Sequence, residues 1–259
     1  GDLPPPKGSP TLTAFEDQPS LIEGNLVVCS IKRRIIALDP ATGQERWVFD
    51  PKGADVSTKK CRGIANWVDQ QAQSNREPNS EVGSQCRSRI FVGTTDYRLI
   101  AIDAKTGKPC AGFGNNGVVK MESSKPELWP GEVAASSRPA IVNDVVVVGS
   151  AVADNQRVDA PSGRVLAFDA RTGKALWEFD PVPRNASDPA LKTWDKGTRG
   201  FGQGNVWSTM AVDHQLDLVY LPTTSASSDF YGGDRPGDNH YTTSVVALRG
   251  STGEVVWHR

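Results

Sequence analysis

Short apolar runs separated by turn-forming residues make up most of this chain. Strand-sized runs cover residues 25–30, 89–94, 144–150 and 218–223, and further candidate strands lie upstream at 139–142 and 206–212. No longer stretch keeps the apolar period of an amphipathic helix, and residues 188–196 form at most one or two helical turns. Runs of this length between Gly, Pro, Asn and Asp are typical of antiparallel strands. The pattern therefore predicts an all-β protein.

A phrase of eleven residues, Ala-x-Asp-x-x-Thr-Gly-x-x-x-Trp, recurs four times. Its copies begin at Ala37, Ala101, Ala167 and Ala247. The second copy has Ala111 in place of the Trp, and the fourth has Arg249 in place of the Asp. We expect each copy to close a hairpin, because Asp and Thr side chains bond nearby amides and Gly supplies a positive φ. The Trp on the following strand is expected to cover the next sheet.

The copies start 64 to 80 residues apart, whereas a bare four-stranded blade needs about 40–50 residues. The excess predicts long loops at 52–86, 112–135 and 180–204, which are usually functional in a compact β fold. Repeated small sheets that need neighbours to bury their faces predict a β-propeller. We expect about four four-stranded blades, ending near residues 50, 114, 180 and 259. They would form a partial propeller domain over 1–259, truncated at both ends.

The composition argues against some classes of function but does not identify one. The chain carries 29 basic and 30 acidic residues, a balance that argues against a nucleic-acid partner. No uninterrupted apolar run approaches the length that crosses a bilayer. The chain opens at Gly1 without a recognisable signal segment, so we expect a piece of a longer protein.

Four cysteines, Cys29, Cys61, Cys86 and Cys110, show no spacing typical of a zinc site. Cys61 and Cys86 flank a polar insertion, so a disulfide between them would close that loop in an oxidising compartment. Four unpaired thiols are the equally weighted alternative.

The repeated phrase resembles the tryptophan-docking motif of quinoprotein alcohol dehydrogenases, which are eight-bladed propellers that use pyrroloquinoline quinone (PQQ). Segments 61–63, 94–103, 147–155 and 205–210 are similar to the membrane-bound glucose dehydrogenase and quinate dehydrogenase branch. The resemblance implies hydride transfer to PQQ from a polyol, a sugar such as glucose, or a cyclic hydroxy acid such as quinate or shikimate. It also implies ubiquinone as electron acceptor and a periplasmic location, attached to the inner membrane through a segment outside this chain.

Other functions share parts of this pattern. Non-catalytic propeller lipoproteins of outer-membrane assembly carry a similar phrase, so a non-enzymatic scaffold for protein–protein interaction is the alternative. A sugar-binding propeller would need an exposed aromatic residue in each repeat, and the loops here do not repeat in that way.

Three residues match cofactor-binding positions of the family. By resemblance, Arg62 pairs with a cofactor carboxylate, Trp207 is the indole floor beneath the flat rings, and Ser136 bonds the cofactor through its hydroxyl. The chemistry agrees, because a guanidinium can bind a carboxylate bidentately and aromatic rings stack. Trp207 is expected to open a strand. The plainer alternatives are a solvated loop arginine, a blade-packing Trp and an ordinary loop serine.

Asp154 and Asn155 match the family's metal position, and their oxygens suit a hard divalent cation such as calcium or magnesium. The alternative is an ordinary Asp-Asn turn. Relatives carry a second ligand, an Asn, after the Tyr-x-Pro-Thr strand. Ser225 stands there in this chain, and its hydroxyl is a poorer cation ligand.

Trp67 stands where glucose-oxidising relatives tend to carry a histidine, and we expect it either to border a substrate pocket or to pack. The acidic and aromatic residues 229–234 are candidates for the mouth of that pocket. The family's catalytic base is an Asp beyond the fourth Trp motif, so we expect no catalytic residue before Arg259. None of the three histidines is a convincing replacement.

Overall fold

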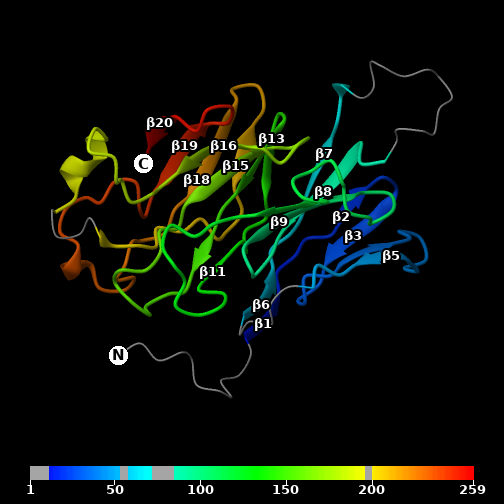
Figure 1. The fold of residues 1–259 in the computed structure, drawn as a ribbon, viewed down its shortest axis with the longest axis horizontal. Coiled ribbons are helices and arrows are strands. Elements are labelled where there is room, and N and C mark those ends of the chain that lie inside the picture. Colours follow the sequence, from blue (N-terminus) through cyan, green and yellow to red (C-terminus); the bar gives the residue numbers. More distant parts are fainter. Residues whose placement is uncertain (1–11, 53–57, 72–84, 196–199) are drawn as a thin grey trace.

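The computed structural model describes residues 12–52, 58–71, 85–195 and 200–259, and its regular elements are almost all strands. Within these residues, four antiparallel sheets of four strands follow one another along the chain, from blue to red in Figure 1. In each sheet the strands pair in the order in which they occur in the sequence. The predicted all-β fold of propeller blades is thereby confirmed.

The blades have the following strands. The first contains β2 (Ser20–Ile22), β3 (Asn25–Cys29), β4 (Ile35–Leu38) and β5 (Glu45–Phe49). The second contains β7 (Ala65–Val68), β8 (Ser88–Gly93), β9 (Arg98–Asp103) and β10 (Val118–Lys120). The third contains β12 (Ala140–Val142), β13 (Val145–Val148), β15 (Val165–Asp169) and β16 (Ala175–Phe179). The fourth contains β17 (Ala211–Asp213), β18 (Leu218–Pro222), β19 (Val245–Arg249) and β20 (Val255–His258).

Four further strands form two small sheets outside the blades. β1 (Leu12–Phe15) pairs in parallel with β6 (Thr58–Cys61), and β11 (Val133–Ala134) pairs antiparallel with β14 (Ala151–Val152). Two short 3-10 helices lie in the described part of the chain: η1 (Pro189–Thr193), inside the segment expected to be weakly helical, and η3 (Gly232–Asp234). No helix in the described ranges has the length and hydrophobicity that crossing a membrane requires.

The first strands of neighbouring blades lie side by side at the inner edge of the arrangement. Strand β12 contacts both β7 and β17. Because successive strands of a blade run in opposite directions, the segment leading into a first strand and the loop between the second and third strands emerge at one rim. The segments that precede β7, β12 and β17 therefore share that rim.

The repeated phrase closes its hairpins as expected. The Asp39 carboxylate accepts hydrogen bonds of 2.9 Å from the amides of Ala41 and Thr42, and Gly43 has a φ of 72°. Asp103 and Asp169 do the same in the next two copies. In the fourth copy, which lacks the Asp, the Asp217 carboxylate accepts from the Ser251 hydroxyl at 2.7 Å. A carboxylate from the preceding hairpin thus restores the missing acceptor.

Aromatic side chains join each blade to the next. A methyl group added at Gly107 would lie 2.5 Å from the Trp47 ring, and one at Gly253 would lie 2.7 Å from the Trp177 ring. The second copy lacks its Trp, and a methyl group added at Gly173 would lie 2.8 Å from the Gly114 nitrogen, 2.9 Å from Val119 and 3.2 Å from the Phe113 ring. The Gly114 amide adds a 2.9 Å hydrogen bond to the Thr172 carbonyl. A Trp ring therefore covers the glycine of the repeated phrase at two of these junctions, and backbone, Val119 and Phe113 together cover it at the third.

The core consists of layers between the blades. Along β13, Val146 and Val148 pack toward the second blade, whereas Val145 and Val147 pack toward the fourth. Likewise, Phe91 belongs to the layer shared with the third blade and its neighbour Ile90 to the layer shared with the first. Because both faces are buried, these strands are continuously apolar.

The cysteines correct one prediction. The disulfides are Cys29–Cys61 and Cys86–Cys110, so both the expected Cys61–Cys86 bridge and the alternative of four free thiols are wrong. Each bridge follows the fold: Cys61 lies at the end of β6 near the end of β3, whereas Cys86 precedes β8 in the second blade. The Cα atoms of the bridged residues are 6.0 and 5.6 Å apart.

The strand expected over 206–212 is shorter than predicted, since β17 begins at Ala211. Trp207 therefore precedes the strand and does not open it. The backbone upstream is engaged elsewhere: the Asn205 carbonyl accepts from Thr224 at 2.9 Å, and the Gly204 amide donates to Ser225 at 3.0 Å. These bonds hold the segment that carries Trp207 against the loop after β18.

Candidate functional site

The β1–β6 pair builds the first part of the candidate site. Phe15 lies opposite Cys61 in the parallel ladder, so the next residues along both strands, Glu16 and Arg62, emerge side by side. The Arg62 Nε and the Glu16 Oε2 are 2.8 Å apart, and the Arg62 side chain is only 14% exposed. Sequence analysis did not identify Glu16, because nothing in the local pattern indicates a parallel pairing of segments this far apart.

Arg62 meets the two other predicted cofactor residues. Its Nη1 donates a 3.0 Å hydrogen bond to the Ser136 hydroxyl, and its guanidinium carbon lies 4.6 Å from the centroid of the Trp207 ring. The three residues precede the inner strands of three consecutive blades. The fold thus gathers a guanidinium, a hydroxyl and an indole at one rim.

Arg33 supports this group and was also missed. It comes from the loop between β3 and β4, has a φ of 59°, and its Nη1 donates to the carbonyls of Gly93 and Ala135 at 2.6 and 2.9 Å. The second bond fixes the residue immediately before Ser136. A buried arginine in a polar loop has no sequence signal that separates it from a solvated one.

The charges at this rim favour an anionic ligand. Burial lowers the pKa of Arg33 to about 10, and the neighbouring Arg62 guanidinium acts in the same direction. Burial also lowers the pKa of Arg62, although Glu16 opposes the shift. Burial therefore disfavours the charged form of both arginines, and an added carboxylate would offset part of that cost.

Asp154 and Asn155 lie in an exposed turn after β14, where Asn155 has a φ of 55°. Pairing of Ala151 with Ala134 and of Val152 with Val133 directs this turn toward Glu132, at the opposite end of β11 from Ser136. The turn shares the rim of Arg62 by topology, but this register places it away from Ser136. Its role in metal binding stays a prediction.

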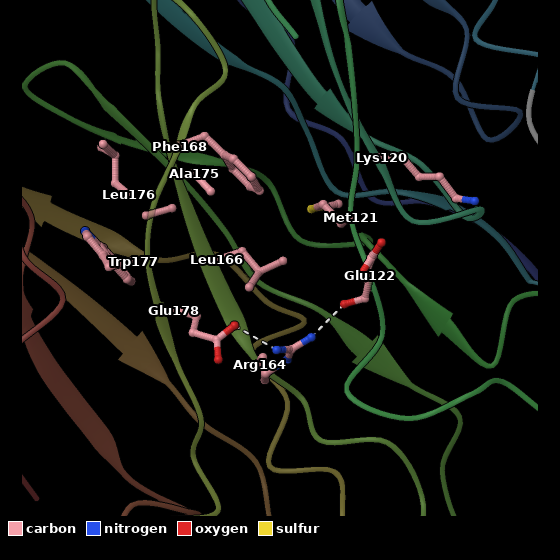
Figure 2. A pocket seen from close by; sticks show the side chains of 11 residues that line it. Lys120, Met121, Glu122, Arg164, Leu166, Phe168, Ala175, Leu176, Trp177 and Glu178 are labelled. Carbon is pink, nitrogen blue, oxygen red and sulfur yellow. Dashed lines mark hydrogen bonds and ion pairs between the residues drawn. The ribbon is translucent and has the colours of Figure 1, made fainter. Parts of the chain in front are cut away.

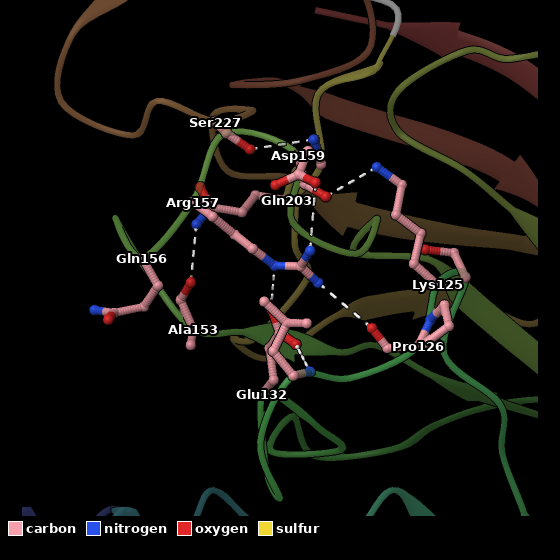
Figure 3. A network of polar contacts seen from close by, with 12 residues as sticks. Lys125, Pro126, Glu132, Ala153, Gln156, Arg157, Asp159, Gln203 and Ser227 are labelled. Atoms are coloured by element: carbon pink, nitrogen blue, oxygen red, sulfur yellow. Dashed lines mark hydrogen bonds and ion pairs between the residues drawn. The ribbon is translucent and has the colours of Figure 1, made fainter. Parts of the chain in front are cut away.

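A buried ion pair anchors that turn (Figure 3). The Arg157 Nε lies 2.7 Å from Glu132 Oε1, and the Glu132 side chain is 1% exposed. The Ala153 amide donates to the Glu132 carbonyl at 2.9 Å, and the Gln203 side chain donates to the Ala153 carbonyl at 3.1 Å. The turn that presents Asp154 is thus held by buried groups from two other segments.

The remaining donors do not complete a metal site. The Ser225 hydroxyl, at the position where the resemblance led us to expect a second metal ligand, donates to the Asp229 carboxylate. In the described residues, no three His, Cys, Asp or Glu side chains come together as a metal-binding group. Asp154 and Asn155 alone fall short of the six to eight oxygens that calcium takes.

Trp67 is buried between the second and third blades. Its indole N–H donates to the Asp144 carboxylate at 3.0 Å, and the guanidiniums of Arg89 and Arg171 lie 5.3 and 5.1 Å from its ring centroid. Arg171 is also held by two hydrogen bonds to Asp69. These contacts agree with the packing alternative, and substrate contact by Trp67 stays a prediction.

Two cavities lie apart from this group. A groove of about 400 Å³ is lined by Met121, Leu166 and Phe168, with Arg164 bridging Glu178 and the Glu122 carbonyl (Figure 2). A cavity of about 640 Å³ is lined by Arg235, His240, His258 and Arg259, among others. The rings of His240 and His258 are 4.4 Å apart. Burial, together with His240 and Arg259, lowers the pKa of His258.

The family follows from comparison with known proteins. Residues 1–259 match the family described as "Glucose/ethanol/alcohol dehydrogenase, beta-propeller domain", and the chain belongs to this PQQ family. This agrees with the fold and with the resemblance that the repeated phrase carries.

Individual relatives show which members of the family the chain is similar to. The chain is 37% identical to quinoprotein glucose dehydrogenase A of Acinetobacter calcoaceticus, over 95% of this chain and 31% of that protein. It is 34% identical to the quinate/shikimate dehydrogenase (quinone) of Acinetobacter baylyi, over 93% and 31% of the two chains. The structure matches the quinohemoprotein alcohol dehydrogenase of Comamonas testosteroni with a TM-score of 0.67 and 25% identity, over 96% and 35% of the two chains. The chain thus spans about a third of the length of these relatives.

Proposed function

We propose that the protein containing this chain is a PQQ-dependent dehydrogenase and that these blades hold part of the cofactor site. The observation that carries the proposal is the contact of Arg62 with both Ser136 and Trp207. PQQ is a flat tricarboxylate, and this group offers a charged donor, a hydroxyl and an aromatic face to such a molecule.

Each residue has a distinct task in the proposed site. Arg62 binds a carboxylate of the cofactor and fixes its orientation, because its donors form a planar fork. Ser136 adds a hydroxyl at the same edge, and the indole of Trp207 supports the ring plane. When bound here, PQQ would supply the acceptor for the hydride that leaves the alcohol carbon of the substrate. The proton acceptor is proposed to be an Asp that follows Arg259 in the intact protein.

Asp154, with Asn155, is the proposed metal-facing turn. Carboxylate and amide oxygens are suitable ligands for a divalent cation, and the Glu132–Arg157 pair holds the turn in place. A europium-containing methanol dehydrogenase has a similar fold, at 23% identity and a TM-score of 0.70. The proposed ion in this protein is calcium or magnesium, with further ligands supplied from outside these two residues.

The proposed substrate is a sugar, a polyol or a cyclic hydroxy acid. Relatives are named as glucose, glycerol and quinate/shikimate dehydrogenases, at 34–38% identity. We further propose ubiquinone as the electron acceptor and a periplasmic, membrane-attached protein with eight blades. The two disulfides suit an oxidising compartment.

Titration of the full-length protein with PQQ, with and without calcium, tests this function against a non-enzymatic scaffold. We expect saturable quenching of tryptophan fluorescence in the wild-type protein, and weaker binding in the Arg62→Gln variant. The Arg46→Gln variant is a matched control, because Arg46 pairs with Asp39 at an exposed docking turn. Absence of quenching in the wild-type protein would favour the non-enzymatic scaffold. In a scaffold, Arg62, Ser136 and Trp207 would have no common function.

A further inference from the structure

The two disulfides occupy different places relative to the candidate cofactor site. Cys61 is the residue before Arg62, and its bridge reaches Cys29 at the end of β3. The Cys86–Cys110 bridge lies within the second blade, where the Cys86 amide donates to the Asp103 carboxylate of the docking turn. One bridge therefore adjoins the cofactor site, and the other adjoins the docking repeat.

Arg62 sits in a short connection between two anchored points. On one side, Cys61 ends β6, which pairs with β1 and belongs to none of the four blades. On the other side, β7 begins at Ala65 in the second blade. Between them, Gly63 has a φ of 131°, a conformation that glycine adopts far more easily than other residues. The position of Arg62 therefore depends on what holds the two ends of this connection.

The Cys29–Cys61 bridge is the covalent part of that constraint. Cys29 and Cys61 are both nearly fully buried, at 1% and 3% exposure. Asp17, two residues after the end of β1, accepts a 2.5 Å hydrogen bond from the Cys29 amide, so the segment after β1 is also tied to the end of β3. The bridge thereby attaches the β1–β6 pair, and with it Arg62, to the first blade.

We propose that the Cys29–Cys61 disulfide is a positioning element of the cofactor site, holding the Arg62 guanidinium against Ser136 and Trp207 before the cofactor binds. This inference rests on the proposed function, because it acts through the arginine that binds the cofactor carboxylate. Opening the bridge leaves the charge of Arg62 unchanged but removes the covalent link between Cys61 and the first blade, so that the β1–β6 pairing alone remains at that point. Cofactor binding then has to order the arginine, and the affinity falls.

A double-mutant cycle on the full-length protein tests the inference. Bridge removal by C29A/C61A is combined with Arg62→Gln, and the dissociation constant for PQQ is measured by tryptophan quenching. We expect bridge removal to weaken binding about tenfold when Arg62 is present and less than about twofold in the Arg62→Gln background. An equal loss in both backgrounds, or no loss in either, would overturn the positioning role.

The control is C86A/C110A, which removes the other bridge. We expect this variant to leave the dissociation constant within about twofold in both backgrounds, whatever it does to thermal stability. A loss as large as that of C29A/C61A, abolished in the same way by Arg62→Gln, would show that the effect is not specific to the bridge beside Arg62. Failure of the wild-type protein to bind PQQ would instead reject the proposed function itself.

If C29A/C61A does not fold, the native protein replaces it. Graded reduction followed by alkylation and mass spectrometry identifies which bridge has opened. We expect the affinity for PQQ to fall with the fraction of opened Cys29–Cys61 and to be independent of Cys86–Cys110. Unchanged affinity after complete opening of Cys29–Cys61 would contradict the proposal.

Discussion

The guanidinium of Arg62 lies over the indole of Trp207, with 4.6 Å between the guanidinium carbon and the ring centroid. The two residues belong to the segments that lead into β7 and β17, so the whole second and third blades lie between them in the sequence. Their contact requires three consecutive blades to be in register at one rim. The contact between Arg62 and Trp207 is therefore evidence for the arrangement of the blades as well as for the proposed site.

Replacing Arg62 by Lys tests the need for a planar fork. The variant keeps the charge but loses paired donors, so we expect PQQ affinity to fall about 10- to 100-fold, as for loss of a hydrogen bond to a charged group. Fluorescence titration measures this. Binding as tight as in the wild-type protein would show that Arg62 contributes no directional hydrogen bonds to the cofactor.

Trp207 and Trp177 should respond differently to replacement by Ala. Trp207 precedes its strand and is 40% exposed, so Trp207→Ala should weaken PQQ binding about tenfold and barely alter thermal unfolding. Trp177 packs on Gly253 and donates to the Gly250 carbonyl at 2.8 Å, so its loss should cost about 3 kcal/mol of unfolding free energy. Denaturant titration and PQQ titration of both variants separate the two roles. Identical changes in PQQ affinity and in unfolding free energy would show that Trp207 and Trp177 do not have separate roles.

The contact between Gly107 and the Trp47 ring can be tested by comparing Gly107 with a glycine of similar backbone conformation that has no such neighbour. Gly24 and Gly107 have similar φ values of 72° and 69°, but only at Gly107 would an added methyl group meet a neighbour, the Trp47 ring. Gly24→Ala should cost about 1–2 kcal/mol from backbone strain. Gly107→Ala should cost about 1–3 kcal/mol more, because the ring has to move. Equal free energies of unfolding would contradict the contact between the blades.

The buried carboxyl group of Asp17 should make the stability of the folded protein depend on pH. Burial raises its pKa above the ordinary value, although the Cys29 amide and Arg138 act in the opposite direction. A raised pKa in the folded state means that its stabilising contribution is present below the unfolded value of about 3.9 and is lost as pH rises through the folded value. The melting temperature of the wild-type protein should therefore fall relative to Asp17→Asn between about pH 4 and neutrality. Melting curves that stay parallel over this range would reject the assignment.

The sequence alone indicated the repeating blade. Its turn chemistry is local, since Asp39 and Gly43 close a hairpin within eleven residues and the pattern recurs with recognisable side chains. The family likeness also directed attention to Arg62, Ser136 and Trp207, which the fold brings together. Their convergence was an expectation from relatives, because nothing local shows that segments on three different blades meet.

Other features depended on the tertiary structure. The disulfide partners follow from where β6 lies against β3, and the ion pair between Glu16 and Arg62 follows from a parallel ladder between distant segments. At the junction whose motif lacks a Trp, Gly173 meets Gly114, Val119 and Phe113, a set of neighbours that the packing of the two blades determines. Local patterns determine which hairpins form, since a turn is closed by its own residues. Long-range packing alone decides which side chains of different blades become neighbours.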